Sequence, residues 1–199
     1  MPACVLTPEQ TEGPYFVDER LERSDVRSDP ADTSVRPGAV LSLDLRILAA
    51  GTGRCDPLTG AIVDIWQCDA AGIYSDADDR SSRTRGAKFL RGYQITDADG
   101  RVRFTTIYPG AYPGRAVHIH FKVRPQTGDR SREFTSQLYF DDALADRVHA
   151  LSPYAGPRAS RTRNERDGLY RHGGRELTLT VTNADGRYAA AYDVGVRVA

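Results

Sequence analysis

Residues 116–123 of the chain read AVHIHFKV. Successive side chains of a β-strand point to opposite faces of the sheet. The odd-numbered positions of this stretch are apolar and would pack against a core, whereas the even-numbered positions after Ala116 hold His118, His120 and Lys122. The stretch therefore predicts a strand that buries one face and presents two neighbouring imidazoles on the other.

The same alternation of apolar and polar residues recurs along the chain and indicates further strands with one buried face. Leucine and isoleucine occupy every second position of 41–47, and apolar residues do so in 177–181 and 188–198. Residues 61–67 (AIVDIWQ) are apolar on both faces apart from Asp64, which suits a strand inside a sandwich. We also predict strands at 89–96, 101–107, 116–124 and 134–140.

Asp-Gly pairs mark tight turns between these strands. Asp99-Gly100 and Asp185-Gly186 are each predicted to close a hairpin. With many short strands and few helical signals, the chain is predicted to be all-β. We expect a mostly antiparallel β-sandwich with long loops and one short helix, forming a single domain over residues 1–199.

The predicted helix follows Asp141-Asp142, which can cap its start, and places Leu144, Val148 and Leu151 on one side. Residues 153–174 are polar, arginine-rich and contain glycine and proline, so a long surface loop is expected there.

Composition argues against some classes of partner. The 199 residues include 27 basic and 27 acidic side chains, so no net charge attracts nucleic acid or an anionic membrane. No apolar run has the length that spans a bilayer. The first ten residues lack the layout of a signal peptide, which predicts a cytoplasmic protein, or an exported one whose signal has been removed. Cys4, Cys55 and Cys68 allow one disulfide and a free thiol, or three thiols.

Histidines two residues apart on a strand can share one metal ion, and we favour this over two surface histidines. His149 and His172 have no partner at ligand spacing and are expected to be ordinary surface residues. Around the pair the sequence offers tyrosines, namely Tyr74, Tyr108 and Tyr112. A phenol ionises only near pH 10, unless a trivalent ion stabilises the phenolate. Two phenolates and a hydroxide would neutralise Fe(III), although core packing would also explain any single tyrosine.

Five segments, taken together and in order, carry a further signal. They are TPEQTEGPY (7–15), GAIVDIWQCDAAGIY (60–74), TDADGRVRFTTIYPGAYP (96–113), RAVHIHF (115–121) and SQLYF (136–140). Over about residues 5–140 the chain thereby resembles the intradiol ring-cleaving dioxygenases, the family of protocatechuate 3,4-dioxygenase and catechol 1,2-dioxygenase.

The resemblance implies an Fe(III) centre held by two tyrosines and two histidines. Tyr74 and His118 would be equatorial ligands, and Tyr112 and His120 axial ligands. Tyr108 falls one turn too early to match the second family tyrosine, so it is expected to be structural.

The resemblance also assigns residues to the substrate. Arg115 matches the family arginine beside the substrate ring, where a fixed cation stabilises developing negative charge. Gln137 matches a glutamine near the bound substrate. The residues expected to wall the pocket are Thr11, Gly13, Pro14, Tyr15 and Ile73.

The implied reaction activates the substrate rather than oxygen. A catechol would bind Fe(III) through both oxygens, and Tyr112, displaced from the metal, would help to take the catechol protons. Attack by O2 and opening of the ring between the hydroxyl-bearing carbons would give a cis,cis-muconate-type diacid. The Tyr112–His118 link is shorter than in those enzymes, and Gly114 stands where protocatechuate enzymes carry a bulky aromatic residue, so we expect an open, permissive pocket.

Two other interpretations were weighed against this one. A cupin-like Fe(II) or Zn(II) enzyme would use His118 and His120 with a carboxylate, but no third ligand stands at a suitable spacing. A transthyretin-like binding module would need the aromatic residues only for packing. The partners expected on the favoured interpretation are a small aromatic diol and O2, and the size suits one subunit of a protocatechuate-type enzyme, which allows a homo-oligomer.

Overall fold

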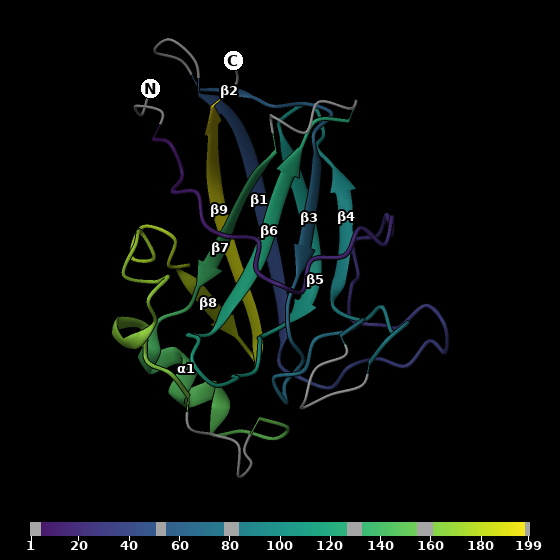
Figure 1. Ribbon diagram of the computed structural model, residues 1–199, viewed down its shortest axis with the longest axis vertical. Coiled ribbons are helices and arrows are strands. Elements are labelled where there is room, and N and C mark those ends of the chain that lie inside the picture. The colour runs from purple at the N-terminus through teal and green to yellow at the C-terminus, as the bar shows by residue number, and fades with distance from the viewer. Residues whose placement is uncertain (1–4, 51–54, 78–83, 127–132, 155–160, 198–199) are drawn as a thin grey trace.

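The computed structural model describes residues 5–50, 55–77, 84–126, 133–154 and 161–197. Two β-sheets pack face to face in it (Figure 1). The first sheet has the order β4 (Arg91–Ile95), β3 (Ile62–Trp66), β6 (His118–Arg124) and β7 (Phe134–Tyr139). The second has the order β2 (Cys55–Pro57), β1 (Val40–Ala50), β9 (Arg187–Arg197) and β8 (Val181–Ala184), with β5 (Arg101–Ile107) also paired to β1.

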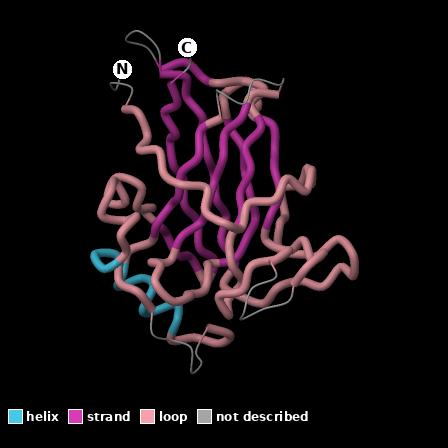
Figure 2. The backbone as a smooth tube through the Cα atoms, in the orientation of Figure 1, coloured by secondary structure: helices cyan, strands magenta, loops and turns pink. Residues whose placement is uncertain are grey.

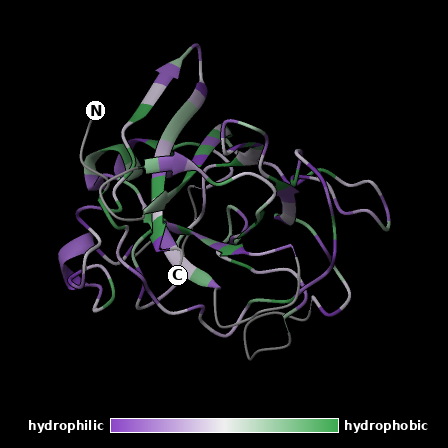
Figure 3. Ribbon diagram, turned by 90° about the horizontal axis from the view of Figure 1, so that it is seen from above, coloured by the Kyte–Doolittle hydropathy of each residue, from purple (hydrophilic) through white to green (hydrophobic). Residues whose placement is uncertain are grey.

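The predicted all-β, mostly antiparallel sandwich is confirmed. Within the described residues the pairing of β1 with β9 is parallel, and every other pairing of two named strands is antiparallel. Strands form the centre of the backbone trace, long loops surround them, and helix is confined to one corner of the molecule (Figure 2). Hydrophobic and hydrophilic residues alternate along strands seen from above (Figure 3).

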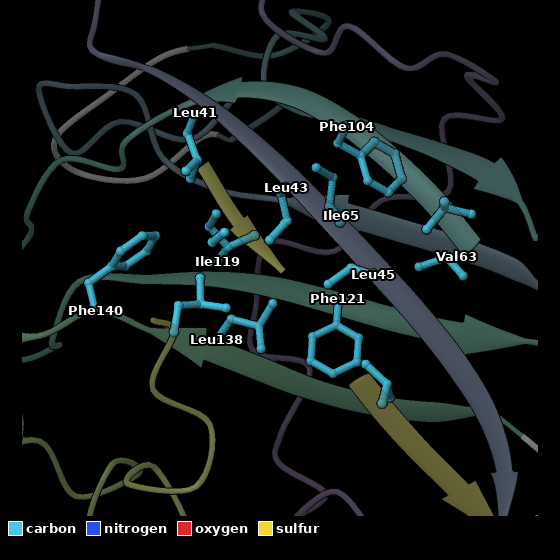
Figure 4. Packing of buried hydrophobic residues seen from close by; sticks show 14 of the residues in the cluster. Leu41, Leu43, Leu45, Val63, Ile65, Phe104, Ile119, Phe121, Leu138 and Phe140 are labelled. Carbon is cyan, nitrogen blue, oxygen red and sulfur yellow. The ribbon is translucent and has the colours of Figure 1, made fainter. Parts of the chain in front are cut away.

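The core lies between the two sheets and fixes the direction of the β6 side chains. Leu41, Leu43 and Leu45 of β1 meet Ile119 and Phe121 of β6, all at most 1% exposed (Figure 4). A slip of one residue in the pairing of β6 would turn this apolar row outward. Burial of the row therefore forces the alternate positions of β6, which include the two histidines, onto the opposite face of the sheet.

The predicted helix is confirmed as α1 (Asp142–His149), and Asp141 caps it by accepting a hydrogen bond from Leu144 N at 2.9 Å. Its buried residues are Ala145 and Val148. The prediction was wrong for Leu151, which lies beyond the helix and is 55% exposed. Nowhere in the described ranges does a helix have the length and apolar character needed to cross a bilayer.

One predicted hairpin is confirmed and the other is wrong. Asp185-Gly186 connects the antiparallel strands β8 and β9, with both residues at positive φ. Asp99-Gly100 also forms a tight turn, in which Gly100 N donates to Asp97 O at 3.0 Å. That turn joins β4 of the first sheet to β5 of the second. Local turn chemistry fixes a chain reversal but does not select the partner of the strand that follows.

The segment after α1 departs from its prediction. Leu177 and Leu179 are buried as their alternation predicts, but they precede β8 and bond through the backbone to Tyr139 of the other sheet. The expected surface loop over 153–174 contains a 3₁₀ helix, Asn164–Arg166, and the buried residue Asp167, which is 1% exposed. A polar side chain with several internal partners can be buried at low cost, and composition does not reveal those partners.

The cysteines differ in their state. Cys55 is disulfide-bonded, whereas Cys68 is a buried free thiol whose pKa is raised by burial. Cys4 lies outside the described residues. Of the two arrangements left open by the sequence, a disulfide with a free thiol is the one observed.

Candidate metal centre

Two imidazoles project from the start of β6 on the face away from the core. The Nε2 atoms of His118 and His120 lie 3.0 Å apart, and both side chains are at most 2% exposed. His118 Nδ1 donates to the Ala116 carbonyl oxygen at 2.6 Å, which leaves its Nε2 as an unprotonated acceptor. The ring of His120 is stacked on Trp66 of β3 at 4.8 Å, so its direction is fixed as well.

Both imidazoles are held neutral. Burial, assisted by the positive charge of Arg115, lowers the pKa of His118 to about 3. Burial and the neighbouring His118 lower the pKa of His120 well below its usual value. His120 Nδ1 is a buried polar atom without a hydrogen-bond partner. A neutral imidazole is the form that binds a metal ion, and this pair offers two such groups at one point.

A tight turn after β3 delivers Tyr74 to the same point. Asp69 Oδ1 accepts hydrogen bonds from Ala71 N and Ile73 N. Gly72 has φ +80°, and a Cβ at this position would lie 2.2 Å from the Ala111 carbonyl oxygen, so only glycine fits. The buried Tyr74 hydroxyl then lies 3.4 Å from His118 Nε2.

Tyr112 reaches the site from the segment before β6. Its hydroxyl lies 3.1 Å from His118 Nε2 and 3.4 Å from the Tyr74 hydroxyl. Tyr108, four residues earlier, is fully buried in the main core beside Phe140, and its hydroxyl has no hydrogen-bond partner. Tyr112 is therefore the tyrosine of this segment that contacts His118 and Tyr74.

The four side chains fit one metal ion. Donor atoms bound at about 2 Å to a common ion lie about 2.8–3.4 Å from one another, and the contacts above span 3.0–3.4 Å. Among the described residues, no cluster of three or more His, Cys, Asp and Glu side chains could hold a metal. Burial raises the pKa of both phenols, so a strongly charged cation is needed to ionise them. The donor set suits a trivalent ion.

Arg115 lies beside this cluster. Its Nη1 atom is 3.5 Å from His118 Nε2, and its Nη2 atom donates to Gln137 Oε1. Burial alone would lower the pKa of the guanidinium, but Tyr112 and Asp167 raise it above the ordinary value. Arg115 is thus a permanent cation at the edge of the site.

Residues 7–16, the N-terminal strap, cross the histidine face of the first sheet in front of β6 (Figure 1). Gln137 Nε2 donates to Thr11 O at 3.0 Å, and a Cβ at Gly13 would lie 3.4 Å from His120 Cε1. The ring of Tyr15 is stacked on Tyr74 at 4.3 Å. The strap therefore covers the site. Within the strap Pro14 is exposed. Ile73, directly before Tyr74, is half-buried.

The strap is also fixed by an ion pair that sequence analysis missed. Lys122, on the same face of β6 as the histidines, is buried and paired with Glu12 of the strap and with Glu133. Its Nζ atom lies 4.1 Å from the ring centre of Phe16. The sequence did contain a signal for this ion pair. Lys122 stands two residues after His120, so on a strand its ammonium group lies on the same face as the two imidazoles.

Neither of the other two histidines joins the centre. His172 is exposed, as expected. The expectation was wrong for His149, which is half-buried, stacked on Tyr154 and donates from Nε2 to the Pro109 carbonyl oxygen at 2.9 Å. Helix α1 holds the His149 side chain against the core, so its contacts there are structural.

The chain is similar to known dioxygenases. The model of a protein family described as "Dioxygenase" matches residues 11–155. A solved structure, the intradiol ring-cleavage dioxygenase from Tetranychus urticae, superposes with a TM-score of 0.84 and 31% sequence identity, covering 98% of this chain and 95% of that one.

Two curated relatives match over shorter lengths. The protocatechuate 3,4-dioxygenase beta chain of Burkholderia cepacia is 39% identical over 42% of this chain and 38% of its own length. Catechol 1,2-dioxygenase 1 of Acinetobacter lwoffii is 27% identical over 87% of this chain and 61% of its own length. The chain thus spans less than two thirds of either relative.

Proposed function

The chain belongs to the intradiol dioxygenase family, and from this premise we propose that it cleaves catechol-type aromatic diols with O2 at an Fe(III) centre. The ring would open between the two hydroxyl-bearing carbons to give a cis,cis-muconate-type diacid that contains both atoms of O2. The observation that carries the proposal is the convergence of two phenols and two neutral imidazoles on one point.

Tyr74, Tyr112, His118 and His120 would hold the iron. When bound, Fe(III) would supply a Lewis acid for both catechol oxygens and so promote loss of their protons, which leaves a catecholate ring that is electron-rich toward O2. The protein contributes the geometry of the site. Trp66 fixes the ring of His120, and the Ala116 carbonyl fixes the tautomer of His118.

The phenolate form of Tyr112, which the iron would stabilise, is proposed as the base that takes a proton from the catechol. Tyr112 is half-buried, whereas Tyr74 is 3% exposed and has the ring of Tyr15 stacked on it. Its greater freedom and its position on the short link before β6 suit a side chain that moves during turnover. A base must lie within hydrogen-bond reach of the proton that it accepts, which a catechol placed between Tyr112 and Arg115 would satisfy.

Arg115 and Gln137 are proposed to act on the substrate. The guanidinium remains charged at any physiological pH and would stabilise negative charge as the ring becomes nucleophilic. Gln137 is buried on β7, opposite His120 in the sheet, and its contacts with Arg115 and with Thr11 O hold it at the boundary between the arginine and the strap. We propose that the wall of the pocket is formed by Thr11, Gly13, Pro14, Tyr15 and Ile73. The short link between Tyr112 and His118, which contains Gly114, would leave the pocket open and so allow a broad range of substrates.

The decisive experiment combines metal content, colour and turnover. Purified protein loaded with iron should be red-brown, because phenolate-to-Fe(III) charge transfer absorbs visible light. Oxygen uptake should then be measured with catechol, protocatechuate, hydroxyquinol and substituted catechols. A colourless protein that takes up no iron, or a coloured one that consumes no oxygen with any of these diols, would contradict the proposal. A transthyretin-like binding module predicts the first of these results. A cupin-like enzyme predicts a colourless protein that holds Fe(II) or Zn(II).

A further inference from the structure

A buried carboxylate from the C-terminal part of the chain reaches the active-site arginine. Asp167 follows the 3₁₀ helix Asn164–Arg166, outside the residues that match the family model. Its side chain is 1% exposed and lies 3.0 Å from Arg115 Nε. Its carboxylate also accepts hydrogen bonds from Ala116 N at 2.8 Å, Leu169 N at 2.7 Å and Tyr170 N at 3.4 Å.

These hydrogen bonds keep Asp167 ionised inside the protein. Burial would raise the pKa of its carboxyl group, but the hydrogen bond from Ala116 N–H and the charge of Arg115 together bring it below the ordinary value. A buried charge is tolerated when it is paired and hydrogen-bonded in this way. The position of Asp167 is therefore set from two backbone sites, independently of Arg115.

Arg115 has a long, flexible side chain that must point at the substrate ring. Asp167 holds the Nε edge of the Arg115 guanidinium. The Nη2 atom contacts Gln137 Oε1 and the Tyr139 hydroxyl, the latter at 3.5 Å. Anchors at two edges fix both the location and the plane of the group. The remaining edge, carrying Nη1, faces His118 and the proposed metal.

The same part of the chain contacts the other walls of the site. Thr162 Oγ1 accepts a hydrogen bond from Gly114 N at 3.1 Å, on the short link before β6. Gln10 of the N-terminal strap donates from Nε2 to the carbonyl oxygens of Leu169 at 2.9 Å and His172 at 3.0 Å. Residues 162–172 therefore contact Arg115, the link between Tyr112 and His118, and the N-terminal strap.

We propose that Asp167 is the positioning residue of Arg115 and that residues 162–172 form a structural part of the active site. The inference rests on the proposed function for its catalytic consequence. Asp167 does not touch the substrate; it acts by holding the guanidinium where negative charge develops. Without it, Arg115 would remain charged but would occupy several rotamers.

The test compares Asp167→Asn with Asp44→Asn. The first substitution is isosteric, but it replaces one carboxylate oxygen by an NH2 group. Its single amide oxygen can accept either from Leu169 N, which bonds to Oδ1, or from Ala116 N and Arg115 Nε, which bond to Oδ2. The second removes a partly exposed acid on β1 that pairs with Arg103 on β5, in the sheet that does not carry the histidines. Asp167→Asn should lower kcat by about 10- to 100-fold with a smaller change in KM, the loss expected when a catalytic group is misplaced. Asp44→Asn should leave both constants unchanged.

A double-mutant cycle separates positioning from general stability. In an Arg115→Gln background, Asp167→Asn should change kcat/KM by less than about twofold, because the group on which it acts is absent. A full loss on top of Arg115→Gln would overturn the inference, as would unchanged kcat in Asp167→Asn alone. Wild-type protein that consumes no oxygen with the diol panel would instead overturn the proposed function.

A readout independent of turnover uses metal-free protein. The Arg115 Nε–H should exchange slowly with solvent in NMR spectra of the wild type, assigned by its loss in Arg115→Gln. Asp167→Asn should accelerate that exchange at least tenfold. Fast exchange in the wild type would overturn the inference even if the Asp167→Asn variant failed to fold.

Discussion

His118 and His120 direct their Nε2 atoms at each other across 3.0 Å inside the protein, at a site where both rings are neutral. Two unprotonated nitrogens at this distance repel each other through their lone pairs, unless a proton or a metal ion lies between them. His118 Nδ1 is committed to the Ala116 carbonyl oxygen, so its ring cannot turn the lone pair away without losing that hydrogen bond.

The pair predicts the effect of removing one imidazole. His120→Ala should lower the iron bound per protein chain at least about tenfold, because each ligand group of a metal site contributes directly to its affinity. Iron should be measured colorimetrically on protein purified with and without added ferric salt. The control is His172→Ala, which removes an exposed side chain bonded to the Gly168 carbonyl oxygen, keeps the backbone carbonyl that accepts from Gln10, and should retain full iron. Full occupancy in His120→Ala would refute its assignment as a ligand.

Tyr74→Phe tests the phenolate ligands. The substitution removes one oxygen from the buried cluster and should abolish much of the visible absorption band and most of the oxygen uptake. Absorption spectra at matched protein and iron concentrations would measure the effect. A spectrum identical to that of the wild type would show that Tyr74 does not contribute a charge-transfer ligand.

Tyr108→Phe provides the matched control and a prediction of its own. The Tyr108 hydroxyl is buried in the core without a hydrogen-bond partner. An unpaired buried hydroxyl is unfavourable, so its removal should raise the free energy of unfolding by about 1 kcal/mol while colour and activity stay unchanged. Urea titration followed by tryptophan fluorescence would measure the difference. A loss of 1 kcal/mol or more would indicate that the hydroxyl has a partner in solution.

The sequence predicted the parts of the site that depend on local pattern. His118 and His120 follow from the alternation of β6, because the core residues between them fix which way they point. Tyr74 and Tyr112 could be distinguished from Tyr108 through the family motifs alone, since all three tyrosines stand in similarly apolar surroundings. The structure then places two of them at the histidines and the third in the core.

Contacts between distant segments were not predictable in the same way. Asp167 lies 52 residues from Arg115, in an arginine-rich stretch without periodicity. Its burial depends on the backbone N–H groups of Ala116 and Leu169, and these become available only when the chain has folded. The turn at Asp99-Gly100 is another example, because its residues specify a reversal while the core decides which sheet receives β5.

Gly13→Ala tests the strap as a wall of the pocket. Gly13 has φ +72°, so alanine should cost about 1 kcal/mol of stability from backbone strain, and its methyl group would lie 3.4 Å from His120 Cε1. The control is Gly186→Ala, at φ +79° with no atom within 4 Å of the added Cβ, in the hairpin of β8 and β9. Both variants should lose similar stability, measured by thermal unfolding. Gly13→Ala alone should raise KM severalfold; equal KM values would exclude Gly13 from the pocket.

The pH dependence of stability should show the charge of Asp167. Its folded-state pKa lies below the ordinary value, so the pair with Arg115 stabilises the fold above the unfolded-state pKa of about 3.9, and this contribution is lost as the pH falls through the folded-state pKa. In metal-free protein, Asp167→Asn should therefore cost about 2 kcal/mol at pH 7, the magnitude of a hydrogen bond to a buried charged group. The difference from the wild type should shrink progressively below pH 4. Urea titrations between pH 7 and pH 2.5 measure it, with Glu165→Gln as the control, because Glu165 is 70% exposed and only 3.7 Å from its partner Arg175. A difference that stayed constant over that range would mean that Asp167 stabilises the fold through its shape and not through its charge.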